Sequence, residues 1–214
     1  NNYGGAASTG NLNIRGMSNN RVLTLQDNIR LPQGFYGLGY DYSNANTVDY
    51  FTLKSIDILK GPASSLYGSD ALGGVVSFNT LTVDDLLEEG EDFNIEIPVN
   101  YKGANKSVGG AGRIAYRDEE SGLSFLAVLS KSEAEELEPN GAPAKYVNDA
   151  EISTKAALLN VNKQINPSNK IGFTIDTYSK DSDIARASGN LSTGYFNYTK
   201  QESDIKQTKN RYIF

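Results

Sequence analysis

The sequence of 214 residues contains no histidine and no cysteine. Without histidine, Ser/His/Asp and Cys/His catalysis, histidine metal sites and the commonest general base near neutral pH are excluded. Without cysteine, disulfide frameworks and thiolate metal sites are excluded, although this assigns no compartment because many disulfide-free proteins work outside the cytoplasm. We therefore predict a protein that is not an enzyme and that has no metal or permanently bound cofactor of its own.

The chain also lacks a basic stripe and a long apolar run. Its net charge is −6, with scattered Lys and Arg, so nucleic acid is not an expected partner. No apolar run approaches the ~20 residues of a membrane-spanning helix. The sequence begins at Asn1 rather than Met, shows no signal peptide, and ends at Phe214 in a strand-like run. We expect a fragment of a longer chain.

The composition favours β structure with many turns, because only 38% of the residues are hydrophobic while 21 are Gly and 13 are Tyr. Residues 1–88 mix short apolar runs with glycine-rich turns, and the alternation in RVLTLQDNIR (21–30) predicts a strand with one drier face. TVDDLLEEG (82–90) predicts a short helix with Thr82 as N-cap and Gly90 past its end. This region predicts a small mixed α/β domain.

From Phe93 onward the chain repeats strands of ~9 to 12 residues with period-2 alternation. Ile95, Ile97 and Val99 share one face, and the same apolar and polar split recurs over 113–117, 159–165 and 171–176. A soluble sandwich also alternates, so this pattern alone does not decide the fold.

The connections between these strands carry more information. Links at 118–122 and 166–170 are short, whereas the stretches 133–152 and 180–210 are long. The first link, 105–107, is short although it falls on the long side. Short turns on one rim and long loops on the other are typical of transmembrane β-barrels, and the exceptional cations of the apolar faces, Lys131 and Lys163, lie near strand ends. Six strands cannot close such a barrel, so we expect the remainder outside this chain.

The segment GPASSLYGSDALGG (61–74) has the glycine content of a phosphate-binding loop. It lacks the Gly-Lys-Ser/Thr of a Walker loop, because Ser69 and Asp70 follow Gly68, and it contains no G-x-G-x-x-G. We interpret it instead as a corner in which Pro62 starts a helical turn, Gly68 ends it, and Ser69 with Asp70 begins a second turn before the chain re-enters a strand.

Three stretches resemble the plug domain of TonB-dependent outer-membrane receptors, most closely the haem and haemoglobin receptor branch: NIRGMSNNRVLTLQDNIR, LKSIDILKGPASSLYGSDALGGVVSFNT and DDLLEEG. The resemblance covers about residues 11–90. Asp27-Asn28 stands where family members often have Asp-Gly, a mild change because Asn also tolerates positive φ. The family's plug motif residues fall on Arg15, Gly16, Gly61, Pro62, Tyr67, Gly68, Gly73 and Gly74.

The resemblance implies an α+β plug domain (1–88) followed by the first antiparallel strands (89–214) of a 22-stranded transmembrane β-barrel. It implies the bacterial outer membrane as location, with outer-membrane lipid around the barrel and TonB as the energy-coupling partner. The segment that contacts TonB would precede Asn1.

The aromatic loop between Arg30 and Leu53 corresponds in the family to an apical loop that faces the extracellular side and touches ligand. Its aromatics suit stacking on a planar ligand, and a Tyr oxygen can ligate ferric haem, so Tyr36 is the candidate haem ligand. Receptors of the haem branch often place a His here, and this chain has none. Alternatively, the aromatics, among them Tyr50 and Phe51, pack the loop against the barrel wall. The predicted ligand-binding residues are Gln33, Phe35, Tyr36, Tyr40 and Tyr42.

These observations favour an importer of haem or haem-protein iron. A ferric-siderophore receptor is the alternative within the family, since a chelate needs no protein ligand to iron. A soluble β-rich binding protein is the alternative outside it, and it predicts that the face bearing Ile171, Phe173 and Ile175 packs against a second sheet. The sequence does not identify the transported substrate.

Overall fold

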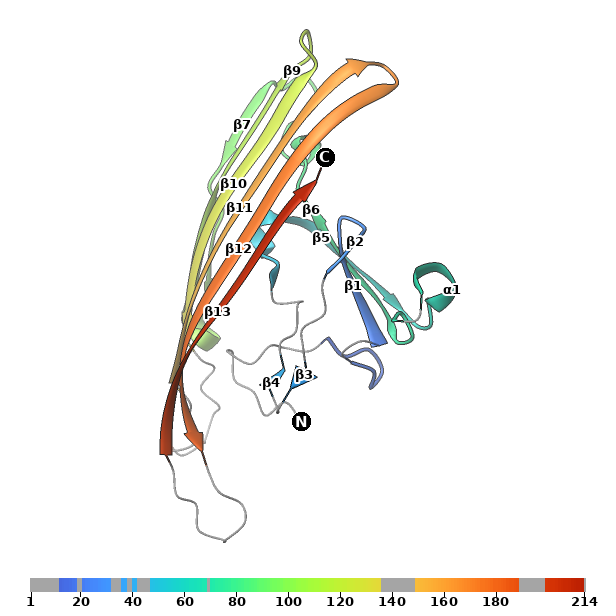
Figure 1. Cartoon of the computed structure of the whole chain (residues 1–214). Helices are drawn as coiled ribbons and strands as arrows, with labels where there is room; N and C mark the ends of the chain where they lie inside the picture. Colours follow the sequence, from blue (N-terminus) through green and yellow to red (C-terminus); the bar gives the residue numbers. More distant parts are fainter. Residues whose placement is uncertain are drawn as a thin grey trace.

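The structure is a computed structural model that describes residues 12–18, 21–31, 36–37, 40–41, 47–68, 70–135, 149–188 and 199–213. It contains a four-stranded sheet of order β2-β1-β6-β5 and a long curved sheet of order β13-β12-β11-β10-β9-β7, with β8 also paired to β9. The small sheet lies on the concave side of the long one (Figure 1). Within these residues, every helix is too short or too polar to cross a membrane.

The four-stranded sheet belongs to a small domain of strands and short helices, as the sequence predicts, and it contains both parallel and antiparallel pairs. β1 runs parallel to β6, whereas β5 is antiparallel to β6 and β2 is antiparallel to β1. The elements are β1 (Val22–Gln26), β2 (Ile29–Arg30), β5 (Leu53–Lys60), α1 (Ser64–Tyr67) and β6 (Gly74–Thr80), with a separate hairpin of β3 (Tyr36–Gly37) and β4 (Tyr40–Asp41). We call the described residues from Leu12 to Leu87 the small domain.

The turn between β1 and β2 has two consecutive residues in the left-handed region, Asp27 at φ +47° and Asn28 at φ +63°. Both residue types tolerate this region, which two-residue hairpin turns require. The turn directs the Asp27 carboxylate toward Thr80, whose backbone N–H and hydroxyl donate to it at 2.8 and 3.0 Å. The carboxylate therefore joins the β1 turn to the end of β6.

The predicted glycine corner is confirmed in part. Gly68 is the C-cap of α1, and Gly74 begins β6 at φ +149°, where a Cβ atom would lie 2.3 Å from the Leu59 carbonyl oxygen. The helix begins at Ser64, after an Ala63 N-cap, rather than at Pro62. A second turn follows, closed by Ala71 N–H, which donates to the Gly68 carbonyl at 3.2 Å, but residues 70–73 form no helix. This stretch bonds across to 61–63: Ala63 N–H donates to the Ala71 carbonyl, and Gly61 N–H to that of Gly73.

A single 3₁₀ turn, η4 (Val83–Asp85), follows β6 and has Thr82 as its N-cap, as predicted. The Asp85 carboxylate accepts from the Thr82 backbone N–H at 2.8 Å and from its hydroxyl at 2.7 Å. Lys54 on β5 approaches the other Asp85 oxygen at 2.5 Å. These contacts attach the chain leaving the small domain to the small sheet.

The long sheet, which we call the wall, is antiparallel throughout. β7 and β8 both pair with β9, and Pro98, which lacks a backbone N–H to donate, lies between them. The two short strands are therefore halves of one interrupted strand. The wall consists of β7 (Phe93–Glu96), β8 (Val99–Lys102), β9 (Ser107–Asp118), β10 (Leu123–Glu135), β11 (Asp149–Asn166), β12 (Asn169–Ser188) and β13 (Thr199–Ile213), with η5 (Gly103–Asn105) linking β8 to β9.

The asymmetry of the links is present, but the long links are shorter than the sequence predicts. Strands β10 and β12 continue to Glu135 and Ser188, and β11 and β13 begin at Asp149 and Thr199. The intervals are 119–122 and 167–168 at one rim, against 136–148 and 189–198 at the other. The prediction was wrong here because these strand ends are polar on both faces, and backbone pairing needs no apolar face.

The two faces of the wall differ as the alternation predicts. On the outward face, Ile97 is 75% exposed and Val99 77%, whereas on the inward face Asp176 is 2% exposed. Ile171 is 64% exposed, and in the described part of the chain no second sheet covers it, contrary to the soluble sandwich. The apolar face of the wall is its outer surface.

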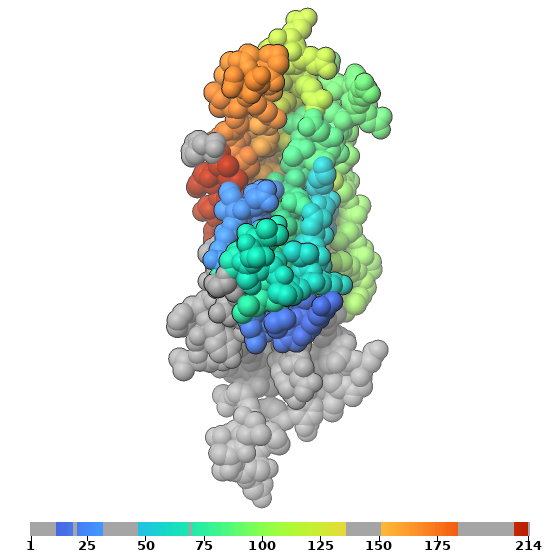
Figure 2. Space-filling view, turned by 90° about the vertical axis from the view of Figure 1, so that its right-hand side faces the viewer, coloured from blue at the N-terminus to red at the C-terminus, as the bar shows by residue number. Residues whose placement is uncertain are grey.

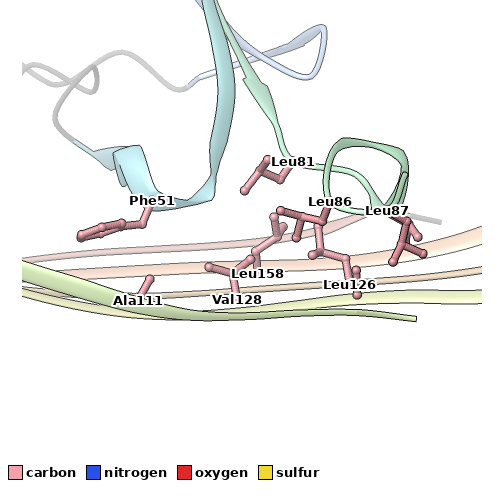
Figure 3. Packing of buried hydrophobic residues seen from close by; sticks show 10 residues of the cluster. Phe51, Leu81, Leu86, Leu87, Ala111, Leu126, Val128 and Leu158 are labelled. Carbon is pink, nitrogen blue, oxygen red and sulfur yellow. The ribbon is translucent and has the colours of Figure 1, made fainter. Parts of the chain in front are cut away.

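The largest core cluster lies between the small domain and the inward face of the wall (Figure 3). Figure 2 shows the small domain, in blue to teal, lying across this face. Full burial of one large apolar side chain contributes about 1.5–3 kcal/mol, so this cluster is a substantial part of the attachment. Its members are Phe51, Leu81, Val83, Leu86 and Leu87 of the small domain with Ala111, Ala115, Leu126, Val128 and Leu158 of the wall.

Candidate functional site at the interface of small domain and wall

The predicted ligand residues lie mostly outside the described part of the chain. Gln33, Phe35 and Tyr42 fall there, so their role stays a prediction. The backbones of Tyr36 and Tyr40 form the β3–β4 hairpin, in which Tyr36 pairs with Asp41 and Gly37 with Tyr40. In Figure 1 this hairpin lies toward the end of the wall where β12 ends and β13 begins. That is the rim with the longer links.

The last two aromatics of the predicted loop contact the wall. Phe51, in η3 (Tyr50–Thr52), is 2% exposed and lies in the core cluster of Figure 3. The Tyr50 ring centroid is 4.2 Å from that of Phe51, and Lys102 of the wall lies over the Tyr50 ring at 5.5 Å. A Cβ atom at Gly109 would lie 2.9 Å from the Tyr50 hydroxyl oxygen. For these two residues, packing against the wall is the observed role.

Arg113 of β9 attaches the wall to this aromatic turn. Its Nε and Nη2 atoms donate to the Phe51 carbonyl oxygen at 3.1 and 2.8 Å, and its Nη1 lies 3.1 Å from Glu96 Oε2. A guanidinium can make such forked contacts because its donors are fixed in one plane. The contact satisfies a backbone carbonyl of the small domain with a charged donor of the wall.

A second attachment, which we call the buried clamp, joins the β1 turn to β12 and β13. It consists of Gln26, Asp27, Asp176, Lys209 and Arg211. Gln26 is fully buried; its Nε2 donates to Asp176 Oδ2 at 2.7 Å, and its Oε1 accepts from Lys209 Nζ at 2.7 Å. Arg211 donates to the Gln26 carbonyl oxygen at 3.0 Å and to Asp27 Oδ2 at 2.6 Å. Every side chain of the clamp therefore contacts the opposite domain or a residue that does.

The clamp is balanced in charge, with two carboxylates and two cations. Asp176 lies 3.1 Å from Lys209 and 3.3 Å from Arg211, and its side chain is only 3% exposed. Breaking such a pair is costly because the remaining charge stays buried without compensation. Arg211 Nε is already buried without a hydrogen-bond partner. The clamp is thus sensitive to the loss of any one member.

Asp49, the N-cap of η3, is a buried carboxylate between the two attachments. It accepts from the Phe51 backbone N–H at 2.8 Å. Burial raises the pKa of Asp49 above its ordinary value of 3.8, and the Asp176 charge adds to the rise, although hydrogen bonds from Phe51 and Ser130 and the charge of Arg113 oppose it. Since the raised pKa disfavours the ionised form in the folded state, stability falls as pH rises through the window above 3.8.

The residues of the plug motif shape the backbone of the small domain. Arg15 and Gly16, at φ +52° and +83°, form the tight turn that the Ile14–Met17 bridge closes. Tyr67 is 46% exposed on α1. Asp70 pairs with Arg30 of β2, so its charge holds the corner against the sheet edge. The remaining motif residues, Gly61, Pro62, Gly68, Gly73 and Gly74, lie in the corner between β5 and β6.

Sequence reasoning did not identify the two attachments. The alternation of apolar and polar residues predicted only that Arg113 and Asp176 lie on the polar faces of their strands. It could not predict which residues they contact, because partners such as Gln26 and Asp176 are 150 positions apart in the chain. A buried Gln at the end of an apolar strand, as in β1, is the local feature that could have indicated a polar contact.

In the comparison with known proteins, the family model matches the first part of the chain, which contains most of the small domain. Residues 1–75 match the family model of the TonB-dependent Receptor Plug Domain. Residues 1–75 therefore belong to the plug domain family of TonB-dependent receptors. The small domain is their plug, and the wall is a set of antiparallel barrel strands.

Among relatives, Heme/hemopexin utilization protein C of Haemophilus influenzae (strain 86-028NP) is 38% identical over 97 residues, which is 44% of this chain and 12% of the relative. The hemin receptor of Yersinia pestis is 32% identical over 111 residues, 51% of this chain and 16% of the relative. Transferrin-binding protein A of Haemophilus influenzae (strain ATCC 51907 / DSM 11121 / KW20 / Rd) is 32% identical over 136 residues, 60% and 15% respectively. The chain spans less than a fifth of the length of these relatives.

Two solved structures share the fold. The siderophore receptor PirA of Acinetobacter baumannii aligns with a TM-score of 0.55 at 17% identity, over 92% of this chain and 38% of that one. The R480A mutant of the ferric enterobactin receptor of Pseudomonas aeruginosa, PfeA, aligns with a TM-score of 0.52 at 18% identity, over 80% and 26%. Both likenesses concern the plug and barrel architecture.

Proposed function

We propose that this protein imports haem or haem-protein iron across the bacterial outer membrane as a TonB-dependent receptor. The observation that carries the proposal is the plug packed on the inward face of a wall whose outer face is apolar. That arrangement suits a gate inside a barrel surrounded by lipid. The names of the haem, hemopexin and hemin relatives support this cargo.

In this proposal residues 1–88 are the plug and residues 89–214 the first strands of a 22-stranded barrel. Ligand arrives at the rim with the longer links, and TonB supplies the energy that moves the plug. Haem or an iron chelate is cargo rather than a permanent cofactor, and the protein is a transporter rather than an enzyme. The ligand contacts are Gln33, Phe35, Tyr36, Tyr40 and Tyr42.

A ferric-siderophore receptor is the second candidate. It is favoured by the two structural neighbours, which are an enterobactin receptor and a siderophore receptor. It is also favoured by the absence of histidine, the residue most often used as a haem ligand in this branch. Such a receptor would hold its chelate by aromatic and polar contacts alone.

The test is a hemin titration of the full-length receptor, followed through the Soret band. The proposal predicts a saturable shift at stoichiometric hemin. The Tyr36→Phe variant should change the Soret spectrum if Tyr36 is an axial ligand, whereas Tyr67→Phe, at an exposed position on α1, should not. No spectral change with the wild-type receptor would favour the siderophore alternative, and an unchanged Tyr36→Phe spectrum would remove Tyr36 as ligand.

A further inference from the structure

Lys180 on β12 is a buried cation on the inward face of the wall. The residue is 8% exposed. Among the described residues it has neither an ion pair nor a hydrogen bond from its side chain, in contrast to Lys209 on the neighbouring strand, which pairs with Asp176. Buried ammonium groups are ordinarily paired, because removing an uncompensated charge from water costs free energy. Lys180 therefore lacks the partner that its surroundings call for.

The neighbouring carboxylates do not supply that partner. Asp176, two inward positions earlier on β12, is engaged by Gln26, Lys209 and Arg211. Asp181 and Asp183 alternate with Lys180 along the strand and so lie on the outward face. Among the described residues, Lys180 is consequently a buried cation without a paired carboxylate.

The register of the wall places Lys180 on the ligand side of the clamp. Lys180 is four positions beyond Asp176 along β12, which places it about 13 Å closer to the rim with the longer links. Across the wall it is opposite Thr154, which is opposite Ser132, and Ser132 is opposite Gly109, where the Tyr50 hydroxyl packs. This inward row is polar and has short side chains between its two ends.

We propose that Lys180 binds an anionic group of the transported ligand, a carboxylate where the ligand is haem. The proposal rests on the proposed function, since haem carries two propionate carboxylates. In the described part of the chain the ammonium has no carboxylate partner, so the ligand supplies the counter-charge. The hydroxyls of Thr154 and of the buried Ser182, one inward position further along β12, flank it as neutral hydrogen-bonding groups. A charge-assisted hydrogen bond of this kind is about twice as strong as a neutral one.

The experiment compares hemin with hemin dimethyl ester, in which both carboxylates are neutralised, on the full-length receptor. Lys180→Met should weaken hemin binding by about tenfold or more and leave binding of the ester unchanged. Lys180→Arg should retain most of the affinity for hemin. Lys155→Met is the matched control: Lys155 is exposed on the outward face of β11, and its loss should change neither affinity.

Thermal unfolding of the ligand-free receptor distinguishes a binding role from a structural one. Because Lys180→Met removes a buried charge that has no partner among the described residues, the melting temperature should stay equal or rise. A fall would mean that Lys180 is paired within the protein and would overturn the proposal, as would unchanged hemin affinity or an equal loss for the ester. A wild-type receptor that binds no hemin would instead overturn the proposed function, and this inference with it.

Discussion

The plug sheet and the barrel wall place their apolar residues differently. In the plug sheet both faces carry buried apolar residues, because Val22 and Val76 pack in one core cluster and Leu23 and Val75 in another. In the wall, Ile97 and Val99 are 75% and 77% exposed, and it is Asp176 that is buried. The centre of the plug sheet is therefore covered on both sides, whereas the wall exposes its apolar residues on its outer face.

The inward face of the wall is not polar throughout. It is apolar mainly where the plug packs against it, at Leu126, Val128 and Leu158. Toward the longer-link rim the inward positions become Ser132, Thr154 and Lys180. The plug is thus held by an apolar patch and by the buried clamp at its edge, and the remainder of the inward face is polar.

The largest expected effect comes from breaking the clamp. Asp176→Asn in the full-length receptor leaves Lys209 and Arg211 short of a counter-charge in a buried site, which should cost about 3–5 kcal/mol of plug stability. Urea-dependent protease cleavage of the plug measures it. Glu119→Gln, in the exposed turn after β9, is the control and should be neutral. A difference below about 0.5 kcal/mol between Asp176→Asn and the wild type would contradict the role of the clamp.

A smaller effect is expected where a charge is placed on the outward face, and its size should depend on depth. Ile114 lies in the outward row of Ile95 and Ala127, whereas Val99 shares its row, through Gly110, with Lys131. Ile114→Arg should therefore cost about 2–4 kcal/mol of folding free energy in lipid vesicles, and Val99→Arg about 0–1 kcal/mol. Equal costs for the two variants would show that the apolar band does not end near Lys131.

The smallest expected effect concerns the end of the plug. Burial raises the pKa of Asp85, but hydrogen bonds from Lys54 and Thr82 outweigh it, so the pKa lies below the ordinary 3.8. The resulting stability is present above that pH and is lost as pH falls through the lowered pKa. Thr82→Ala should cost about 1 kcal/mol at pH 7 and flatten this acid dependence, measured by unfolding from pH 7 down through the window below 3.8. Ser65→Ala on α1 is the control, and an unchanged pH profile would contradict the contact.

Much of the fold could be predicted from local pattern. The alternation in 171–176 gave a strand with the correct apolar face, and Thr82 was identified as a cap, because these features depend on a few neighbouring residues. The strand in 21–30 was also predicted, but its single drier face was wrong, because β1 lies between two core clusters and is buried on both faces. The strand ends near Glu135 and Ser188 could not be predicted, since both faces are polar there and only pairing with the adjacent strand defines them.

The candidate site was harder to predict than the fold. Alternation tells which face Asp176 occupies but not that Gln26 and Lys209 meet there, because partners distant in sequence are set by how the plug sits in the wall. Similarly, Phe51 belongs to the same aromatic run as Tyr36, and nothing in the neighbouring sequence indicates that Phe51 packs on the wall. The ligand contacts of Gln33, Phe35, Tyr36, Tyr40 and Tyr42 stay predictions.

The most direct test of the account is the accessibility of single cysteines introduced along β10 from Phe125 to Lys131, in full-length receptor reconstituted in lipid and otherwise free of reactive cysteine. A membrane-soluble maleimide should label the outward positions 125, 127 and 129 and spare 126 and 128, which face the plug core. Labelling that alternates in this sense supports a wall with lipid outside and plug inside. Equal labelling at Val128 and Leu129, or the inverse pattern, would contradict it.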